Sequence, residues 1–203
     1  MASEKDWYNT IVAPSEEILF KEKGSKFFGY AFPVTSEEDA REAIEVLQKQ
    51  HYAARHHCYA WQLGDRYEHY RVNDDGEPSN SAGAPIYGQI QAFSLTNVLV
   101  VVVRYFGGTK LGVGGLIQAY KTAAKMALES SHIVKRTINQ YFIVQCDYPD
   151  MNTVMRILKS EKLKIVDQKM ELNCRFRISV RERDAETVFQ IFKNTHKVNI
   201  KRE

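Results

Sequence analysis

The strongest hydrophobic pattern in the chain is an unbroken run of aliphatic residues from Val98 to Val103. A continuous apolar run of this length predicts a strand that is buried on both faces. A glycine-rich stretch follows, and apolar positions then recur on one face of a predicted helix from about Leu116 to Glu129. The glycines of that stretch are Gly107, Gly108, Gly112, Gly114 and Gly115. The pattern therefore predicts a strand, a glycine loop and a helix in direct succession.

Upstream of this stretch, alternating and helical periods predict further strands and helices. Strands are expected at residues 18–20, 26–32, 56–63 and 67–72, the last two as a hairpin. A helix is expected to start after Thr35 or Ser36 and to end near Gln50, because hydroxyl side chains cap helices and acidic residues suit the first turn. Pro85 favours a short helix that ends near Gln91.

After Arg136 the pattern changes, and we predict two domains, residues 1–136 and 137–203. The second domain has a regular succession of expected elements. They are strand 140–146, helix 149–160, strands 162–168 and 170–181, helix 184–193 and strand 197–201. This βαββαβ order is typical of the ferredoxin-like fold, so the predicted class is α+β.

In the third strand of that domain, arginines alternate with apolar residues. The period of two places Arg175, Arg177 and Arg181 on one face and the apolar residues on the other. This face is a candidate nucleic-acid surface, because guanidinium groups bind phosphates. An ordinary solvated sheet face is the alternative, and the aromatic pattern of an RNA-recognition motif is missing.

Composition and charge narrow the class of protein. A hydrophobic content of 44% and a charged content of 26% in 203 residues are ordinary for a water-soluble globular protein. Residues 1–136 hold 15 Lys and Arg against 16 Asp and Glu, whereas residues 137–203 hold 13 against 9. The basic surplus of the last third hints at a nucleic-acid or ribosomal partner, although charge alone fits a solvated surface equally well.

Location and metal content are also constrained by the sequence. No apolar run approaches the roughly 18 residues that span a bilayer, and the first ten residues have no signal-peptide core, so we expect a cytoplasmic protein without a membrane role. The cysteines are widely spaced, which predicts buried thiols in a reducing compartment and no structural zinc. They are Cys58, Cys146 and Cys174.

The glycine loop is a candidate anion site, because glycines allow close approach of backbone N–H groups and a helix begins after the loop. Arg104 and Lys110 flank the glycines and suit a phosphate or carboxylate. The loop matches neither the Walker P-loop nor the dinucleotide fingerprint. Tight turns and close packing of strand and helix are the alternative explanation for the glycines.

A polar loop from Asn73 to Pro85 supplies further candidate ligand-binding residues, which are Asp74, Asp75, Glu77, Ser79 and Ser81. The carboxylates are suited to holding a hard cation such as Mg²⁺, to pairing with Arg104 and Lys110, or to simple turn formation. His56 and His57 lie next to each other in a strand and therefore face opposite ways, which disfavours a shared metal ion. We expect one of them to face a cleft, and we expect no cofactor.

Three motifs, RYFGGTKLGVGGLIQAY, HHCYAW and NDDGEPSNSAGAP, together resemble the IMPACT/YigZ family. A Ser-Lys-Phe element at Ser25 is also shared with it. The chain departs from the family pattern in two places: Asn80 and Ser81 stand where Gly-Thr is usual, and Gln118 stands where Arg is common. An anion-binding role is therefore not carried over to Gln118.

The resemblance implies an N-terminal domain like the second domain of a ribosomal small-subunit protein and a C-terminal domain like one of elongation factor G. It implies a non-catalytic, translation-associated regulator that binds RNA, the ribosome or a translation factor, with no sequence-specific DNA role. The alternative is an enzyme that acts on a small phosphorylated or anionic substrate in a cleft between the acidic loop and the glycine loop. No recognised pair of nucleophile and base supports that alternative.

Overall fold

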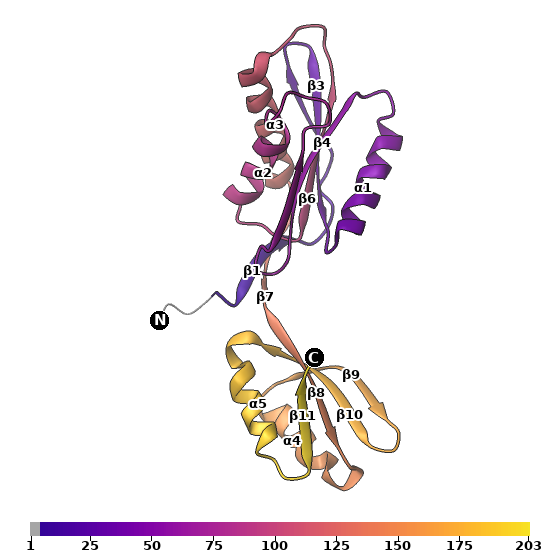
Figure 1. The fold of residues 1–203 in the computed structure, drawn as a ribbon, viewed down its shortest axis with the longest axis vertical. Coiled ribbons are helices and arrows are strands. Elements are labelled where there is room, and N and C mark those ends of the chain that lie inside the picture. The colour runs from indigo at the N-terminus through magenta and orange to yellow at the C-terminus, as the bar shows by residue number, and fades with distance from the viewer. Residues whose placement is uncertain (1–4) are drawn as a thin grey trace. The chain divides into compact units, whose positions relative to one another are not determined.

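The computed structural model describes residues 5–203, and these form two compact units (Figure 1). One unit is Tyr8–Arg136, and the other combines Thr137–Glu203 with residues 5–7. The sequence analysis predicted that residues 5–7 belong to the first domain, residues 1–136. Residues 1–4 of that predicted domain lie outside the described part. Residues 5–7 group with the second unit because the Asp6 carboxylate binds Arg181 and the Asp6 carbonyl accepts the Ile138 N–H at 2.8 Å.

The Tyr8–Arg136 unit is built on a five-stranded antiparallel sheet in the order β2-β3-β6-β4-β5. The strands are β2 (Ile18–Glu22), β3 (Ser25–Pro33), β4 (His56–Leu63), β5 (His69–Asn73) and β6 (Val98–Tyr105). β6 is central, and every residue from Val98 to Val103 is fully buried. The predicted two-sided strand is confirmed, and both of its neighbours, β3 and β4, are antiparallel to it.

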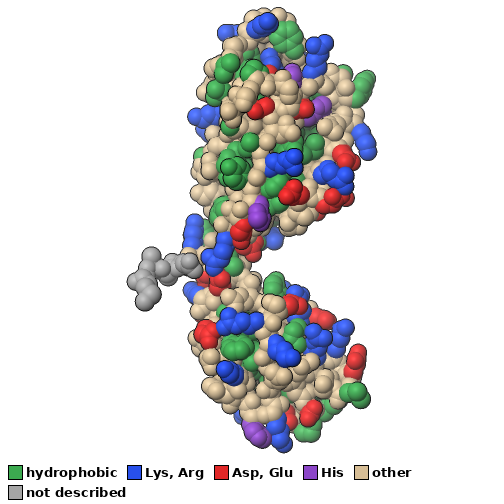
Figure 2. Space-filling model, in the orientation of Figure 1, with side chains coloured by type: hydrophobic (Ala, Val, Ile, Leu, Met, Phe, Trp, Pro, Cys, Tyr) green, Lys and Arg blue, Asp and Glu red, His purple; other side chains and the backbone are tan. Residues whose placement is uncertain are grey.

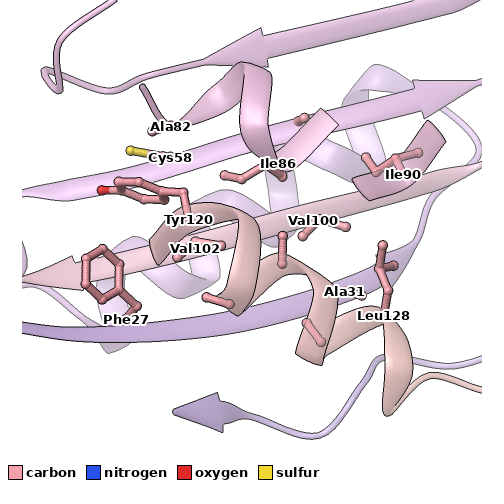
Figure 3. Packing of buried hydrophobic residues seen from close by; sticks show 14 of the residues in the cluster. Phe27, Ala31, Cys58, Ala82, Ile86, Ile90, Val100, Val102, Tyr120 and Leu128 are labelled. Carbon is pink, nitrogen blue, oxygen red and sulfur yellow. The ribbon is translucent and has the colours of Figure 1, made fainter. Parts of the chain in front are cut away.

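Helices cover both faces of this sheet, as Figure 1 shows. On one face, α2 (Gly83–Ala92) and α3 (Gly112–Glu129) pack over the even-numbered valines of β6, and Figure 3 shows Ile86, Ile90, Tyr120 and Leu128 in this layer. On the other face, the odd-numbered positions of β6 form a second core with Trp61 and with Leu47 of α1 (Glu37–Gln50). The predicted two-face burial of β6 therefore divides into two cores.

The first residues of α1 and α3 show how well sequence signals predict where a helix begins. Ser36 caps α1, because its side chain accepts the Asp39 N–H while the Asp39 carboxylate accepts the Ser36 N–H. The predicted start of α3 near Leu116 was wrong by one turn, since the helix begins at Gly112. Its first turn is exposed, so the apolar period that marks a helix begins only at Leu116.

The chain also forms a two-stranded sheet of β1 (Trp7–Ile11) and β7 (Ile133–Thr137), which the sequence did not predict. Both segments are short and mix polar with apolar residues. Their pairing joins positions more than 120 residues apart in the sequence, and no local pattern indicates such a partner.

The C-terminal unit has the predicted βαββαβ order. Its elements are β8 (Asn139–Cys146), the short 3₁₀ turn η1 (Tyr148–Asp150), α4 (Met151–Ser160), β9 (Lys164–Met170), β10 (Cys174–Arg181), the 3₁₀ turn η2 (Glu182–Asp184), α5 (Ala185–Lys193) and β11 (Val198–Arg202). The sheet is antiparallel in the order β11-β8-β10-β9. Phe142, Phe176 and Phe192 are fully buried between sheet and helices. The expected strand 170–181 is shorter, because Glu171–Asn173 form the turn between β9 and β10.

No helix within residues 5–203 is both long enough and apolar enough to cross a membrane.

Candidate functional site

The acidic loop and the end of β6 meet at a buried ion pair between Glu77 and Arg104. Nη1 of Arg104 donates to Oε1 of Glu77 at 2.6 Å, and the two side chains are only 7% and 5% exposed, respectively. The Arg104 guanidinium also lies over the rings of Phe27 and Phe106. The two loops that the sequence singled out are thus joined, with opposite charges in contact where water is excluded.

The same carboxylate oxygen accepts a second hydrogen bond from α3. The Tyr120 hydroxyl donates to Glu77 Oε1 at 2.8 Å, and its pKa is raised by burial and by the neighbouring Cys58 and Glu77. Burial likewise raises the pKa of the Cys58 thiol, which donates to the Asp74 carbonyl at 3.0 Å. Neither group is an activated nucleophile at neutral pH.

His56 and His57 face opposite sides of the sheet, as the strand period predicts. His56 Nδ1 lies 2.8 Å from the Asp75 carbonyl, so this nitrogen carries a proton and Nε2 faces Glu77 Oε1 at 4.0 Å. His57 lies in the other core, where burial lowers its pKa below 6.5, and its backbone N–H donates to Asp75 Oδ2 at 2.6 Å. His56 is therefore the histidine beside the buried pair.

Asp74 organises the acidic loop through three backbone N–H groups. Its Oδ1 accepts from Ala82 at 2.9 Å and from Gly83 at 2.8 Å, and its Oδ2 accepts from Asn80 at 2.8 Å. The N-cap residue of α2, Ala82, has no side-chain acceptor of its own. Asp74 thus caps this helix from outside it, where a negative charge is favourable.

The two predicted serines differ in exposure. Ser81 is fully buried and donates to the Pro78 carbonyl at 2.6 Å, which fixes the loop. Ser79 is exposed and accepts a hydrogen bond from the Asn80 side chain. No histidine hydrogen-bonds either hydroxyl within the described chain, so the structure does not bring together a nucleophile and a base.

A resident cation is not favoured by the carboxylates of the acidic loop. The oxygens described above accept from backbone N–H groups, from Arg104 and from Tyr120. No group of three or more His, Cys, Asp or Glu side chains within residues 5–203 has the arrangement of a metal site. The residues present fit internal hydrogen bonding better than Mg²⁺ coordination.

The five glycines of the loop have different roles. A Cβ on Gly107 would lie 1.9 Å from the carbonyl carbon of Gly24, so this glycine permits backbone-to-backbone contact with the β2–β3 turn. A Cβ on Gly115 would lie 3.1 Å from the Leu111 side chain. Gly108, Gly112 and Gly114 border open space. One glycine is thus required for packing, as the alternative explanation of the loop predicted, and three leave backbone accessible, while anion binding stays a prediction.

The contact at Gly107 brings in residues that the sequence analysis did not select. The β2–β3 hairpin carries Lys21 and Lys26 in its strands and Lys23 in its turn, all exposed, and Lys110 is exposed on the glycine loop. The sequence signal for these lysines was the short connection between the expected strands 18–20 and 26–32. Only the tertiary structure shows that this turn packs against the glycine loop.

The arginines of β10 are mostly paired. Arg181 binds both oxygens of Asp6, at 2.5 and 2.9 Å, and Arg177 binds Glu203 at 2.7 Å while its guanidinium lies over the Tyr141 ring. Arg175 is exposed and makes no hydrogen bond or ion pair with any residue in the range 5–203. The predicted common face exists, but its charges are not equally accessible.

The Tyr8–Arg136 unit also has a cavity of about 500 Å³ beside α1, on the sheet face opposite the Glu77–Arg104 pair. Its lining includes His57, Tyr59 and Trp61 from β4 and Glu38 and Glu45 from α1. Asp75 of the acidic loop also lines it, whereas Glu77 and Arg104 do not. The sequence analysis did not predict this cavity.

Comparison with known proteins places the chain among related sequences. The Impact N-terminal domain matches residues 23–128. The chain is 32% identical over 177 residues to the IMPACT family member YvyE of Bacillus subtilis (strain 168), covering 87% of this chain and 81% of that protein. It is 31% identical over 159 residues to the IMPACT family member YigZ of Escherichia coli (strain K12), covering 77% of this chain and 78% of that protein. A crystal structure of a hypothetical protein superposes with a TM-score of 0.73 at 26% identity and covers 97% of both chains.

Proposed function

Because this chain belongs to the IMPACT family, we propose that it is a non-catalytic, translation-associated protein that acts by binding RNA of the translation machinery. The ribosome or an RNA-bound translation factor is the setting in which it would meet that RNA. We further propose that the Tyr8–Arg136 unit is related to the second domain of a ribosomal small-subunit protein and that the C-terminal unit is ferredoxin-like.

One observation carries the proposal: the sheet face of the C-terminal unit that points away from α4 and α5 is polar and mainly basic. The β-sheet register places Asn199, Gln145, Arg175 and Lys169 side by side across four strands. An exposed row of amides and cations can donate to phosphates and to base edges. Tyr141, 38% exposed on the same face, offers a ring for stacking.

The enzymatic alternative has less support, because the carboxylates of the predicted cleft are already used in the fold, although Nε2 of His56 makes no hydrogen bond within residues 5–203. Glu77 neutralises Arg104 and accepts from Tyr120, while Asp74 holds three backbone N–H groups. A general base needs a carboxylate or imidazole within reach of substrate, with its lone pair free. The carboxylates of Glu77 and Asp74 instead stabilise the loops through internal hydrogen bonds.

The test is RNA binding by the full-length protein, measured by fluorescence anisotropy with a labelled 12-nucleotide RNA between about 50 and 300 mM salt. The double variant Arg175→Ala/Lys169→Ala should weaken binding and flatten the plot of log affinity against log salt by about 1.4, because each lost phosphate contact on a single strand contributes about 0.7. The matched control is Lys159→Ala/Lys193→Ala, which removes the same charge from the helices of the same unit. Absence of binding by the wild-type protein at 50 mM salt would reject the proposed function.

A further inference from the structure

We propose that the β2–β3 turn and the glycine loop form one binding surface for single-stranded RNA, a second site whose ligand class rests on the proposed function. This loop-end surface consists of Lys21, Lys23, Lys26, Phe106 and Lys110. Figure 2 shows Lys or Arg side chains and a hydrophobic side chain at the top of the view, the end of the unit where Figure 1 draws the loop before α3.

The turn and the loop are held together as one body. The Gly107 N–H donates to Ser25 Oγ at 3.1 Å, and Ser25 is fully buried. Their backbones touch so closely that a Cβ on Gly107 would lie 2.2 Å from the Ser25 nitrogen. The backbone of the turn is therefore held against the loop segment that carries Lys110, three residues after Gly107.

The lysines are placed without charge compensation. Lys21 and Lys26 are directly opposite each other in the β2–β3 register, where like charges are destabilising. None of the four lysines forms an ion pair with a carboxylate of residues 5–203. The carboxylate within the turn, Glu22, is half-buried and lies opposite Ser25. An anionic ligand would remove the repulsion that the fold itself leaves in place.

An aromatic ring stands beside these charges. Phe106 follows Arg104 and Tyr105 at the end of β6 and is 53% exposed, although Phe is usually buried. The Arg104 guanidinium supports its ring from one side, with 5.6 Å between the guanidinium carbon and the ring centroid. An exposed, braced ring next to lysines is the combination by which proteins hold unpaired bases and their phosphates.

The backbone of the loop is also accessible at this surface. Gly108 and Gly112 have positive φ values of 88° and 71°, and nothing lies within 4 Å of a Cβ placed on Gly108, Gly112 or Gly114. α3 begins here without a side-chain cap and without an acidic residue in its first turn. Its first N–H groups are therefore left for solvent or for a phosphate.

Together, spaced lysines and an exposed ring favour an extended, flexible polyanion with bases over a compact small anion. A single phosphate would contact one or two of the lysines and would not use Phe106. A duplex would keep its bases stacked and unavailable to the ring. Single-stranded RNA would use the lysines, the Phe106 ring and the accessible backbone of the loop at once.

The experiment measures anisotropy of a labelled oligouridylate of 12 nucleotides with the full-length protein at about 100 mM salt. Lys21→Ala/Lys26→Ala should weaken binding at least about 10-fold and lower the salt slope by about 1.4. Phe106→Ala should weaken binding between about 5-fold and about 150-fold with little change in salt slope, since a stacked base contributes about 1–3 kcal/mol. Lys121→Ala/Lys125→Ala, on the body of α3, is the charge-matched control and should bind as wild type.

The outcomes separate this site from the proposed function. If wild type binds, the Arg175→Ala/Lys169→Ala protein is weakened and both loop-end variants bind normally, the loop-end surface is rejected and the proposed function stands. If wild type fails to bind at 50 mM salt, both proposals fall. If inorganic phosphate at about 1 mM displaces the RNA completely and shortening the RNA to two nucleotides does not weaken binding, the site takes a small anion and the RNA assignment is wrong.

Discussion

Glu77 Oε1 accepts hydrogen bonds from both Arg104 Nη1, at 2.6 Å, and the Tyr120 hydroxyl, at 2.8 Å. One buried oxygen thus joins the acidic loop, the end of β6 and the third turn of α3. A buried carboxylate is stable only when such donors replace its water, so this triad fixes how the two loops meet.

Removing the Tyr120 hydroxyl should destabilise the protein. Tyr120→Phe leaves the ring packed against Phe27 but takes one donor from a buried, charged acceptor, and we expect a loss of about 1.5–3 kcal/mol in the free energy of unfolding. Urea denaturation measures this loss. Tyr52→Phe is the control, because that side chain is 87% exposed. Equal stability of the two variants would contradict a stabilising role for the hydrogen bond.

Removing the Asp74 carboxylate should loosen the start of α2. Asp74→Ala leaves three backbone N–H groups without their acceptor, and we expect a destabilisation of about 1–2 kcal/mol, the usual cost of losing a helix cap. Amide hydrogen exchange at Ala82 and Gly83 should accelerate more than exchange at the middle of α3. Glu42→Ala, which removes an exposed carboxylate from α1, should leave both amides protected.

Stability should fall at acidic pH because of two buried histidines. Burial lowers the folded-state pKa of His51 and of His57 below 6.5, so the unfolded chain binds these protons first as the pH decreases. The free energy of unfolding should therefore be constant above about pH 7.5 and decline below about pH 6.5, by at most about 1.4 kcal/mol per pH unit for each histidine. Urea midpoints at pH 7.5 and 5.5 measure the decline.

The cause of that decline is testable by substitution. His51 lies between two phenols: its Nε2 is 2.6 Å from the Tyr30 hydroxyl, which donates to Glu17, and its Nδ1 is 3.0 Å from the Tyr105 hydroxyl. Because the Tyr30 hydroxyl donates its hydrogen to Glu17, it can only accept from His51. Nε2 of His51 therefore donates to Tyr30, and Nδ1 accepts from the Tyr105 hydroxyl. His51→Gln should reduce the pH dependence, whereas His69→Gln, an exposed histidine, should leave it unchanged. An unchanged pH dependence in His51→Gln would show that other groups cause the decline.

Glycines with and without a contact should respond differently to alanine. Gly107→Ala places a methyl group against the backbone of Gly24 and should destabilise the protein by several kcal/mol or displace the β2–β3 turn. Gly88→Ala and Gly114→Ala lie in helices with nothing within 4 Å, and each should stabilise the protein by up to about 1 kcal/mol, less where the position is close to the helix end. Thermal denaturation ranks the three variants, and a stable, native-like Gly107→Ala protein would contradict the close contact.

The sequence was sufficient to predict a structural feature wherever the physical cause of that feature is local. The run Val98 to Val103 specified a strand buried on both faces, and Thr35 or Ser36 before an acidic first turn indicated the start of α1. The alternation of Cys174 to Arg181 specified which side chains of β10 face the helices. In each case the cause acts within a few residues, through side-chain period or capping, and the printed order of residues contains it.

Tertiary structure alone decided which groups meet. The sequence proposed that the acidic loop and the glycine loop share a cleft, and it offered pairing of the acidic carboxylates with Arg104 as one alternative. It did not indicate which carboxylate would pair, that Tyr120 would donate to the same oxygen, or that Gly107 would pack against a turn 82 residues earlier. The same limit applies to Arg181, which a segment near the N-terminus neutralises through Asp6. Contacts of this kind depend on loop closure and on close packing between distant segments, and neither has a period or a spacing that a linear sequence displays.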